Sequence, residues 1–234
     1  MVFYILKPIP VRVTPKALKT SKVTDLSLYA IGVPAILNLA LPSFLISFLN
    51  SVLAAYSDSY VVILGIYYKL QTFLYLPANG IIQGMRPLIG YNFGARQYSR
   101  VTEVTKLTMK WAIGVATTGF LLCQLFPSVI VRMFTTDPEL IEAAVYGLHI
   151  VFAVFPIVGF QMVATNFFLS IGMSKKAIFL SLTRQMLFLV PCLLILPRWF
   201  GTLGVWISIP IADTTATIVT ALVLINQFRK FHSK

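Results

Sequence analysis

Three ionisable side chains fall inside long apolar runs of this 234-residue chain, namely Lys69, Arg184 and Asp213. A charge at bilayer depth is costly, so such a group normally faces a protein interior or an aqueous cavity and marks a functional site. With a helical rise of about 1.5 Å per residue, Lys69 and Asp213 lie roughly 13 Å, and Arg184 roughly 10 Å, from the nearer helix end. Their equal depth makes Lys69 and Asp213 candidate partners across a cavity wall.

Polar side chains continue from these residues along helical faces. Spacings of three and four place such groups on one side of a helix. We interpret the faces as a transport path on which Asp213 alternates between an ionised and a protonated or cation-bound state. The alternative is a permanent Lys69–Asp213 pair with the other polar groups bonded between helices; Arg184 could equally reach the membrane surface. The path residues are Lys69, Thr72, Leu76, Asn79 and Gln83 in one run, Asp213 and Thr217 in another, and Gln161 in a third.

Composition restricts the class of protein. The chain is 58% hydrophobic and 11% charged, whereas soluble domains carry roughly 25% charged residues. The net charge of +12 comes from basic residues in short segments between apolar runs, which favours an anionic membrane surface over nucleic acid. The residues form no nucleophile–base set and no metal-ligand cluster, so we expect neither an enzyme nor a cofactor or metal site.

The fold class predicted from the apolar runs is an all-α integral membrane protein. Each run approaches the roughly 20 residues that cross a hydrocarbon core. Connections rich and poor in Lys and Arg alternate along the chain, which places both termini in the cytoplasm. We expect a basic connection over 1–28 that begins with the end of an earlier helix, a six-helix lobe over 29–226 and a basic tail over 227–234. The six spans are 29–53, 60–84, 111–130, 146–171, 177–196 and 204–224.

The segment 77–96 is predicted to be the cytoplasmic corner between the second and third spans. It contains four glycines and two prolines, residue types that favour unusual backbone conformations or close packing. Pro87, Asn92, Gly94 and Arg96 lie in its second half and are expected to have a structural or gating role, as is Arg184.

At this corner the chain resembles the multidrug and toxic compound extrusion (MATE) family of cation-coupled antiporters. Further similar motifs occur in family order along nearly the whole chain. They are Pro77 to Gly84, Pro87-Leu-Ile-Gly-Tyr-Asn-Phe-Gly-Ala-Arg96, Phe134-Thr-Thr-Asp-Pro-Glu139, Gly172-Met-Ser-Lys-Lys-Ala177, Arg184-Gln185, Pro191 with Leu196-Pro197, and Gly204-Val-Trp206 followed by Pro210-Ile-Ala-Asp213.

The resemblance covers only the C-terminal of the family's two six-helix lobes. It implies a plasma-membrane antiporter that couples export of lipophilic or cationic drug-like compounds to entry of protons or sodium. The partners implied are membrane lipid and a missing N-terminal lobe, or a second copy of the chain that replaces it. Two alternatives remain: a lipid-linked sugar flippase of the same superfamily, and a non-transporting six-helix module that needs a partner lobe.

Overall fold

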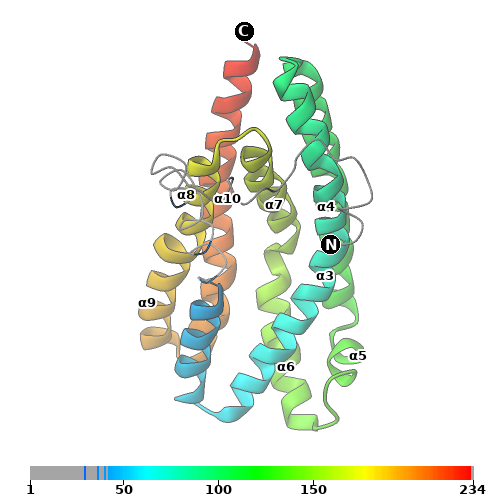
Figure 1. Ribbon diagram of the computed structural model, residues 1–234. Helices are drawn as coiled ribbons and strands as arrows, with labels where there is room; N and C mark the ends of the chain where they lie inside the picture. The colour runs from blue at the N-terminus through cyan, green and yellow to red at the C-terminus, as the bar shows by residue number, and fades with distance from the viewer. Residues whose placement is uncertain (1–28, 30–35, 37–39, 41, 233–234) are drawn as a thin grey trace, which may run out of the picture. The chain divides into compact units, whose positions relative to one another are not determined.

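The computed structural model describes residues 42–232 together with Tyr29, Ile36 and Ala40. The chain divides into two compact units, Met1–Leu37 and Asn38–Lys234, and every element below belongs to the second. The predicted basic connection over 1–28 lies outside the described residues, and so does most of the first half of the span 29–53. The second half of that span forms the helix Pro42–Ala54, drawn in blue in Figure 1.

Two long helices follow and run in opposite directions (Figure 1). Helix α3 spans Asp58–Gly94, and Ser57 caps its start by accepting a hydrogen bond from the Ser59 backbone N–H. Helix α4 spans Tyr98–Leu125 and packs along α3. A short helix α5, Pro127–Arg132, lies beyond the end of α4.

The predicted corner over 77–96 is wrong for most of its length, because α3 does not end at residue 84 but continues through Pro87 to Gly94. Ala78, Ile82, Met85 and Ile89 keep helical spacing and are buried. The stabilisation from burying these side chains offsets the cost of the backbone hydrogen bonds that are lost at proline in a helix interior. Three of the four glycines have open space around them, and only Gly90 approaches another element, since a Cβ there would lie 3.5 Å from the Ser170 carbonyl oxygen.

The remaining helices cross the unit three more times. Helix α6, Pro138–Val151, is capped by Asp137, which accepts a hydrogen bond from the Glu139 backbone N–H at 3.0 Å. It continues through the 3₁₀ turn η2, Phe152–Val154, into α7, Phe155–Ser170. The return consists of α8, Ser174–Leu182, the π-helical segment η3, Thr183–Leu189, and α9, Val190–Phe200, and α10 spans Thr202–His232.

Within the part of the chain that the structure describes, four helical segments are long and apolar enough to cross a membrane: Asp58–Gly94, Pro138–Ser170, Ser174–Phe200 and Thr202–Phe231. Helix α4 is long, but its first half carries Arg100, Glu103, Lys106 and Lys110. Since the first span lies partly outside the described residues, the number six stays a prediction. Several boundaries differ from those predicted: α3 continues past residue 84, α4 begins well before residue 111, α6 begins before residue 146, and α10 continues into the expected tail.

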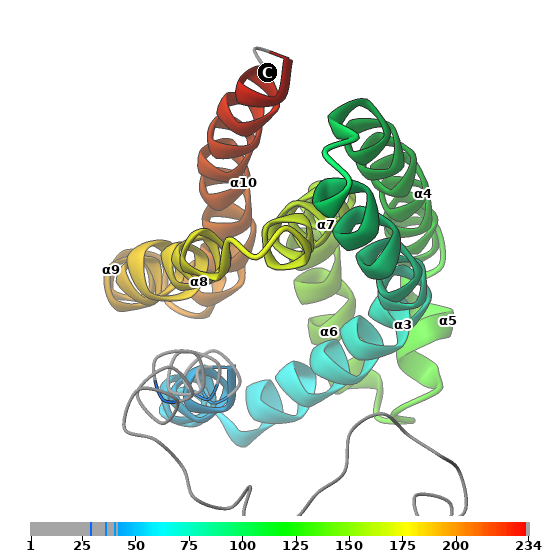
Figure 2. The same cartoon turned by 45° about the horizontal axis from the view of Figure 1, so that its top comes forward.

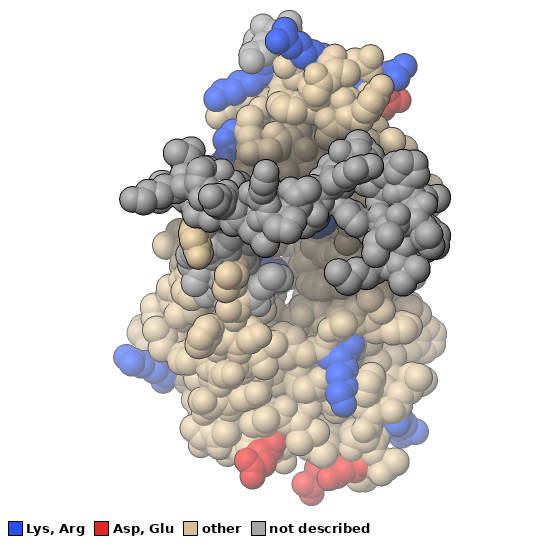
Figure 3. All heavy atoms as spheres, in the orientation of Figure 1, with Lys and Arg blue, Asp and Glu red and all other residues tan. Residues whose placement is uncertain are grey.

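The core consists of two apolar clusters, one toward each end of the unit. One contains Phe152 and Trp206, and the other contains Phe167 and Phe231. In Figure 2, α8, α9 and α10 lie on one side of α7, whereas α3 and α4 lie on the other. Figure 3 shows basic side chains and one acidic side chain around the upper end, and acidic side chains at the lower end with further basic ones above them.

Candidate functional site

The central feature of the candidate site is an ion pair between η3 and α10. The Nε of Arg184 donates to Oδ1 of Asp213 at 2.6 Å. The Asp213 side chain is 6% exposed and that of Arg184 is 26% exposed. A carboxylate this deeply buried is retained in its charged form only when it is paired and hydrogen-bonded, and the guanidinium provides both interactions.

The π-helical geometry of η3 has a local cause in the sequence. Pro191 follows two residues after Leu189, the last residue of the segment. A proline inside a helical rod has no N–H, and its ring collides with the carbonyl four residues earlier. A wider π turn relieves that collision, and such turns are frequent at functional sites. The rod therefore stays continuous while the turn that carries Arg184 is widened.

A pocket of about 200 Å³ adjoins the ion pair. Arg184 lines it, and three tyrosines from α3 give it an aromatic, hydroxyl-rich wall. The hydroxyl of Tyr67 accepts a hydrogen bond from the Gln71 amide. The Tyr75 hydroxyl and the Gln185 side-chain oxygen are buried without a hydrogen-bond partner among the described residues. The lining comprises Pro42, Leu45, Ile46, Tyr67, Tyr68, Gln71, Tyr75, Arg184, Gln185, Leu189 and Ile209.

The predicted Lys69–Asp213 pair is wrong, because Asp213 pairs with Arg184. Lys69 is exposed on α3. Helix α10 packs against η3 and α9, whereas α3 packs mainly against α4 and α7. The alternative for Arg184, reaching the membrane surface, is likewise replaced by its bond to Asp213.

The polar stripe on α3 does form one face, since all five of its predicted members are exposed within the described part of the chain. At about 100° per residue, this face adjoins the side of α3 that carries Tyr68, Gln71 and Tyr75. The stripe and the pocket therefore occupy neighbouring sides of one helix. The stripe consists of Lys69, Thr72, Leu76, Asn79 and Gln83.

The threonine hydroxyls in these stripes bond to their own helices. Thr72 donates to the Tyr68 carbonyl at 2.8 Å, and Thr217 donates to the Asp213 carbonyl at 2.7 Å. Thr217 therefore bonds to the backbone of Asp213 and not to its carboxylate. These bonds do not connect helices, so the interhelical role considered for such hydroxyls is not observed for Thr72 or Thr217.

Two further polar residues concern α7: Gln161 lies on this helix, and Arg86 contacts it from α3. Gln161 is 5% exposed, and its side-chain oxygen has no hydrogen-bond partner among the described residues. Arg86 was not among the predicted site residues, yet its Nη2 and Nε donate to Oδ1 of Asn166 at 2.6 and 3.2 Å. That contact joins α3 to α7 beside Gln83, whose oxygen lies 3.5 Å from Arg86 Nη1. Asn166 follows Met162 by four residues, so the two lie on one face of α7. This spacing does not indicate that the partner of Asn166 is Arg86 on α3.

The corner residues have structural positions. The Asn92 side chain donates to the Leu88 carbonyl at 2.8 Å, and its own carbonyl accepts from the Gln97 N–H at 2.9 Å. Arg96 adopts a φ of 58°, in the left-handed region that usually favours glycine. Gly94 ends α3, and Pro87 lies inside it. The turn thus closes at residues 95–97 with Arg96 in the position typical of a helix-terminating glycine.

Comparisons with known proteins agree with this architecture. The MatE family profile matches residues 34–194. The multidrug export protein MepA of Staphylococcus aureus (strain MSSA476) is 28% identical over 228 residues, which cover 96% of this chain and 49% of MepA. MepA of Staphylococcus haemolyticus is 26% identical over 89% of this chain and 46% of its own length. The chain spans about half the length of the curated relatives it matches.

Solved structures give the same result. The MATE multidrug transporter DinF-BH superposes with a TM-score of 0.84 at 36% identity, over 100% of this chain and 53% of its own. An outward-facing MATE family transporter of the MOP superfamily superposes with a TM-score of 0.85 at 20% identity, over 99% of this chain and 52% of its own. The second similarity concerns the fold alone. Because the family profile covers most of its length, this chain belongs to the MatE family of multidrug transporters.

Proposed function

We propose that the chain acts as the C-terminal lobe of a cation-coupled antiporter that exports lipophilic or cationic compounds. It would occupy the plasma membrane with both termini in the cytoplasm and would carry out transport without catalysis. Asp213 is the coupling carboxylate, and protons or sodium ions are the coupling cations. The relatives named multidrug export proteins support the substrate class.

The observation that carries the proposal is the ion pair beside the tyrosine-lined pocket. Asp213 is buried and lies at membrane depth, and Arg184 neutralises it. An incoming proton or sodium ion could replace the guanidinium as the partner of the carboxylate. Arg184 would then be free to turn toward the pocket that it already lines. A change of partner of this kind would give the lobe two states that differ by the one positive charge of the bound cation.

Transport also needs a second lobe opposite this one. The exposed stripe that includes Lys69, Thr72 and Gln83 carries polar groups at membrane depth, where contact with lipid is unfavourable. We propose that this face lines the substrate path between two lobes. The opposite lobe could belong to the same polypeptide, to another chain, or to a second copy related by a two-fold axis.

The test is efflux of a fluorescent lipophilic cation from vesicles that contain the protein with its second lobe. Efflux is measured under an imposed proton gradient and then under a sodium gradient. The Asp213→Asn variant should lose the dependence on the gradient, because the amide cannot exchange a proton or bind a cation as a carboxylate does.

Thr214→Val is the matched control on α10. Thr214 is exposed, and its hydroxyl bonds to the Pro210 carbonyl of its own helix. Both variants must reach the membrane at the wild-type level. Gradient-driven efflux at the wild-type rate by Asp213→Asn would refute the coupling role, and equal losses in the two variants would show that α10 is merely sensitive to substitution.

A further inference from the structure

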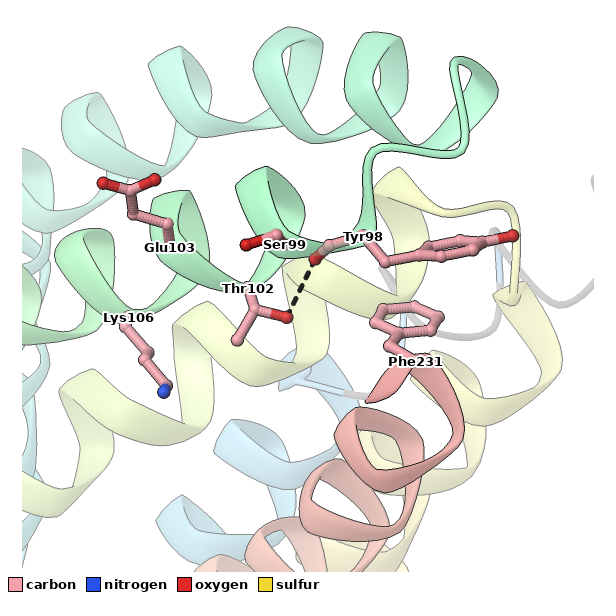
Figure 4. A pocket seen from close by; sticks show the side chains of 6 residues that line it. All are labelled: Tyr98, Ser99, Thr102, Glu103, Lys106 and Phe231. Atoms are coloured by element: carbon pink, nitrogen blue, oxygen red, sulfur yellow. Dashed lines mark hydrogen bonds between the residues drawn. The ribbon is translucent and has the colours of Figure 1, made fainter. Parts of the chain in front are cut away.

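Two hollows flank an aromatic stack at the end of the unit where α4 begins and α10 ends. The rings of Tyr98 and Phe231 stack with centroids 4.8 Å apart. The larger hollow, of about 500 Å³, lies between α4 and α10, and Figure 4 shows its lining. The smaller hollow, of about 270 Å³, is lined by Phe93, Tyr98, Met173, Lys176, Gln227, Lys230 and Phe231. Because Tyr98 and Phe231 line both, the two hollows are adjacent.

Lys176 is held in a defined position in the smaller hollow. Its Nζ donates to the Gln227 side-chain oxygen at 2.7 Å and lies 5.4 Å from the centre of the Phe168 ring. Gln227 is itself buried. An ammonium group has three donors, so the bond to Gln227 leaves capacity for a further acceptor. Lys176 is therefore positioned as part of a site rather than extended into solvent.

The charge around the stack is positive. Lys176 and Lys230 both line the smaller hollow, so two like charges face one space. Among the described residues, no carboxylate lines that hollow. The larger hollow adds Lys106 and Glu103, which point away from each other in Figure 4. Two adjacent lysines in one pocket favour an anion that can contact both.

The surroundings indicate that this anion is attached to a lipid. Leu107 and Trp111 follow Lys106 on α4 and are exposed, with 56% and 63% of their surfaces accessible. The larger hollow shares Tyr98 and Phe231 with the smaller one and extends along α4 to Lys106, the residue before Leu107. A basic pocket connected in this way to an apolar outer surface matches a phospholipid, whose phosphate lies next to its acyl chains. Basic pockets between spanning helices near a membrane surface bind anionic headgroups in this way. A soluble phosphate would gain nothing from the apolar surface.

We propose that the hollows beside the Tyr98–Phe231 stack bind the headgroup of an anionic phospholipid. Lys176 and Lys230 contact its phosphate, and Lys106 interacts with the rest of the headgroup across the stack. The acyl chains lie along the exposed apolar side of α4. This site is separate from the Arg184–Asp213 pair and does not depend on the proposed transport function.

The test is lipid binding to the purified full chain, measured by native mass spectrometry and by thermal unfolding in detergent. Phosphatidylglycerol is the anionic probe, phosphatidylcholine is the neutral probe, and glycerol 3-phosphate is the soluble probe. Each lysine near a membrane surface contributes roughly a fivefold gain in affinity for anionic lipid. The double variant Lys176→Gln/Lys230→Gln should therefore bind phosphatidylglycerol about 25-fold more weakly on that basis.

The matched control is Lys175→Gln/Arg229→Gln. It removes the same charge from the same two helices one residue away, and neither residue lines either hollow. It should retain most of the wild-type affinity. Equal losses in the two double variants would overturn the site in favour of general surface attraction. Equal binding of phosphatidylglycerol and phosphatidylcholine by the wild-type protein, which requires no variant, would also overturn it, and so would equal stabilisation by glycerol 3-phosphate.

Discussion

Lys69 and Arg184 are both basic residues within apolar helices, yet they lie in opposite environments. Arg184 forms a short ion pair with a buried carboxylate, whereas Lys69 is exposed and has no hydrogen bond or ion pair to another described residue. Depth along the membrane normal is the same for Lys69 and Asp213 by residue count, but it is only one of three coordinates. The helix that packs beside α10 decides which cation reaches Asp213.

The largest difference between the two regions should appear on removal of the guanidinium. Arg184→Gln leaves the buried Asp213 carboxylate without its partner, and an orphaned buried charge costs about 3 kcal/mol or more. Because the Arg184 side chain is 26% exposed, we expect the lower end, about 3 kcal/mol, in thermal unfolding of the purified protein.

The double variant Arg184→Gln/Asp213→Asn is the control for that prediction. It removes both charges, so it should be more stable than Arg184→Gln alone. If the double variant is as unstable as the single one, the loss comes from packing of the arginine side chain and the paired-charge interpretation fails.

A smaller effect of opposite sign is expected at Tyr75, on the pocket side of α3. Its hydroxyl is buried without a hydrogen-bond partner among the described residues, while its ring stacks on Phe155 with centroids 5.5 Å apart. Tyr75→Phe keeps the ring and removes the unsatisfied group, so the protein should become more stable by up to about 1 kcal/mol.

Tyr56→Phe is a useful contrast to Tyr75→Phe, because the Tyr56 hydroxyl donates to the Pro197 carbonyl at 3.2 Å. That substitution removes a hydrogen bond and should not stabilise the protein. Marked destabilisation by Tyr75→Phe would mean that the hydroxyl is bonded after all, with the neighbouring Arg184 guanidinium as the candidate donor.

The smallest effect on the fold is expected at Lys69. Lys69→Gln removes an exposed cation without a described partner, so the free energy of unfolding should change by less than about 0.5 kcal/mol. The proposed path role predicts a changed rate of drug efflux by the same variant. Unaltered efflux together with unaltered stability would reduce Lys69 to a surface residue, and a large loss of stability would show that it has a hidden partner.

Elements of the fold that depend on local chemistry could be predicted from the sequence, whereas those that depend on packing between helices could not. Asp137 and Pro138 specify the start of α6 through local chemistry, since a capping carboxylate and a proline at the first helical position need no distant contact. The predicted span 60–84 included Pro77, but the continuation of α3 past residue 84 and through Pro87 was not predicted, because it depends on α4 and α7 burying Met85 and Ile89. Local signals for a break were overridden by packing.

In the candidate site, too, local patterns placed single residues but did not predict contacts between distant segments. Helical spacing placed Lys69, Thr72, Asn79 and Gln83 on one exposed face. The cost of a buried charge singled out Lys69, Arg184 and Asp213, of which Arg184 and Asp213 pair with each other and Lys69 is exposed. The bond from Arg86 to Asn166 joins residues 80 positions apart, so no local pattern contains it. The tyrosine-lined pocket likewise combines α3 with η3 and the helix Pro42–Ala54.

The sequence by itself determined that the chain is a membrane-embedded helical protein, which charges are unusual, and which residues share a helical face. These properties follow from hydropathy and from the period of a helix, and both act within single segments. Only the tertiary structure decided that Asp213 pairs with Arg184, that α3 continues to Gly94, and that Lys176 and Lys230 share a pocket. Each of these depends on which helices pack together, and segments distant in the chain come together only when the chain folds.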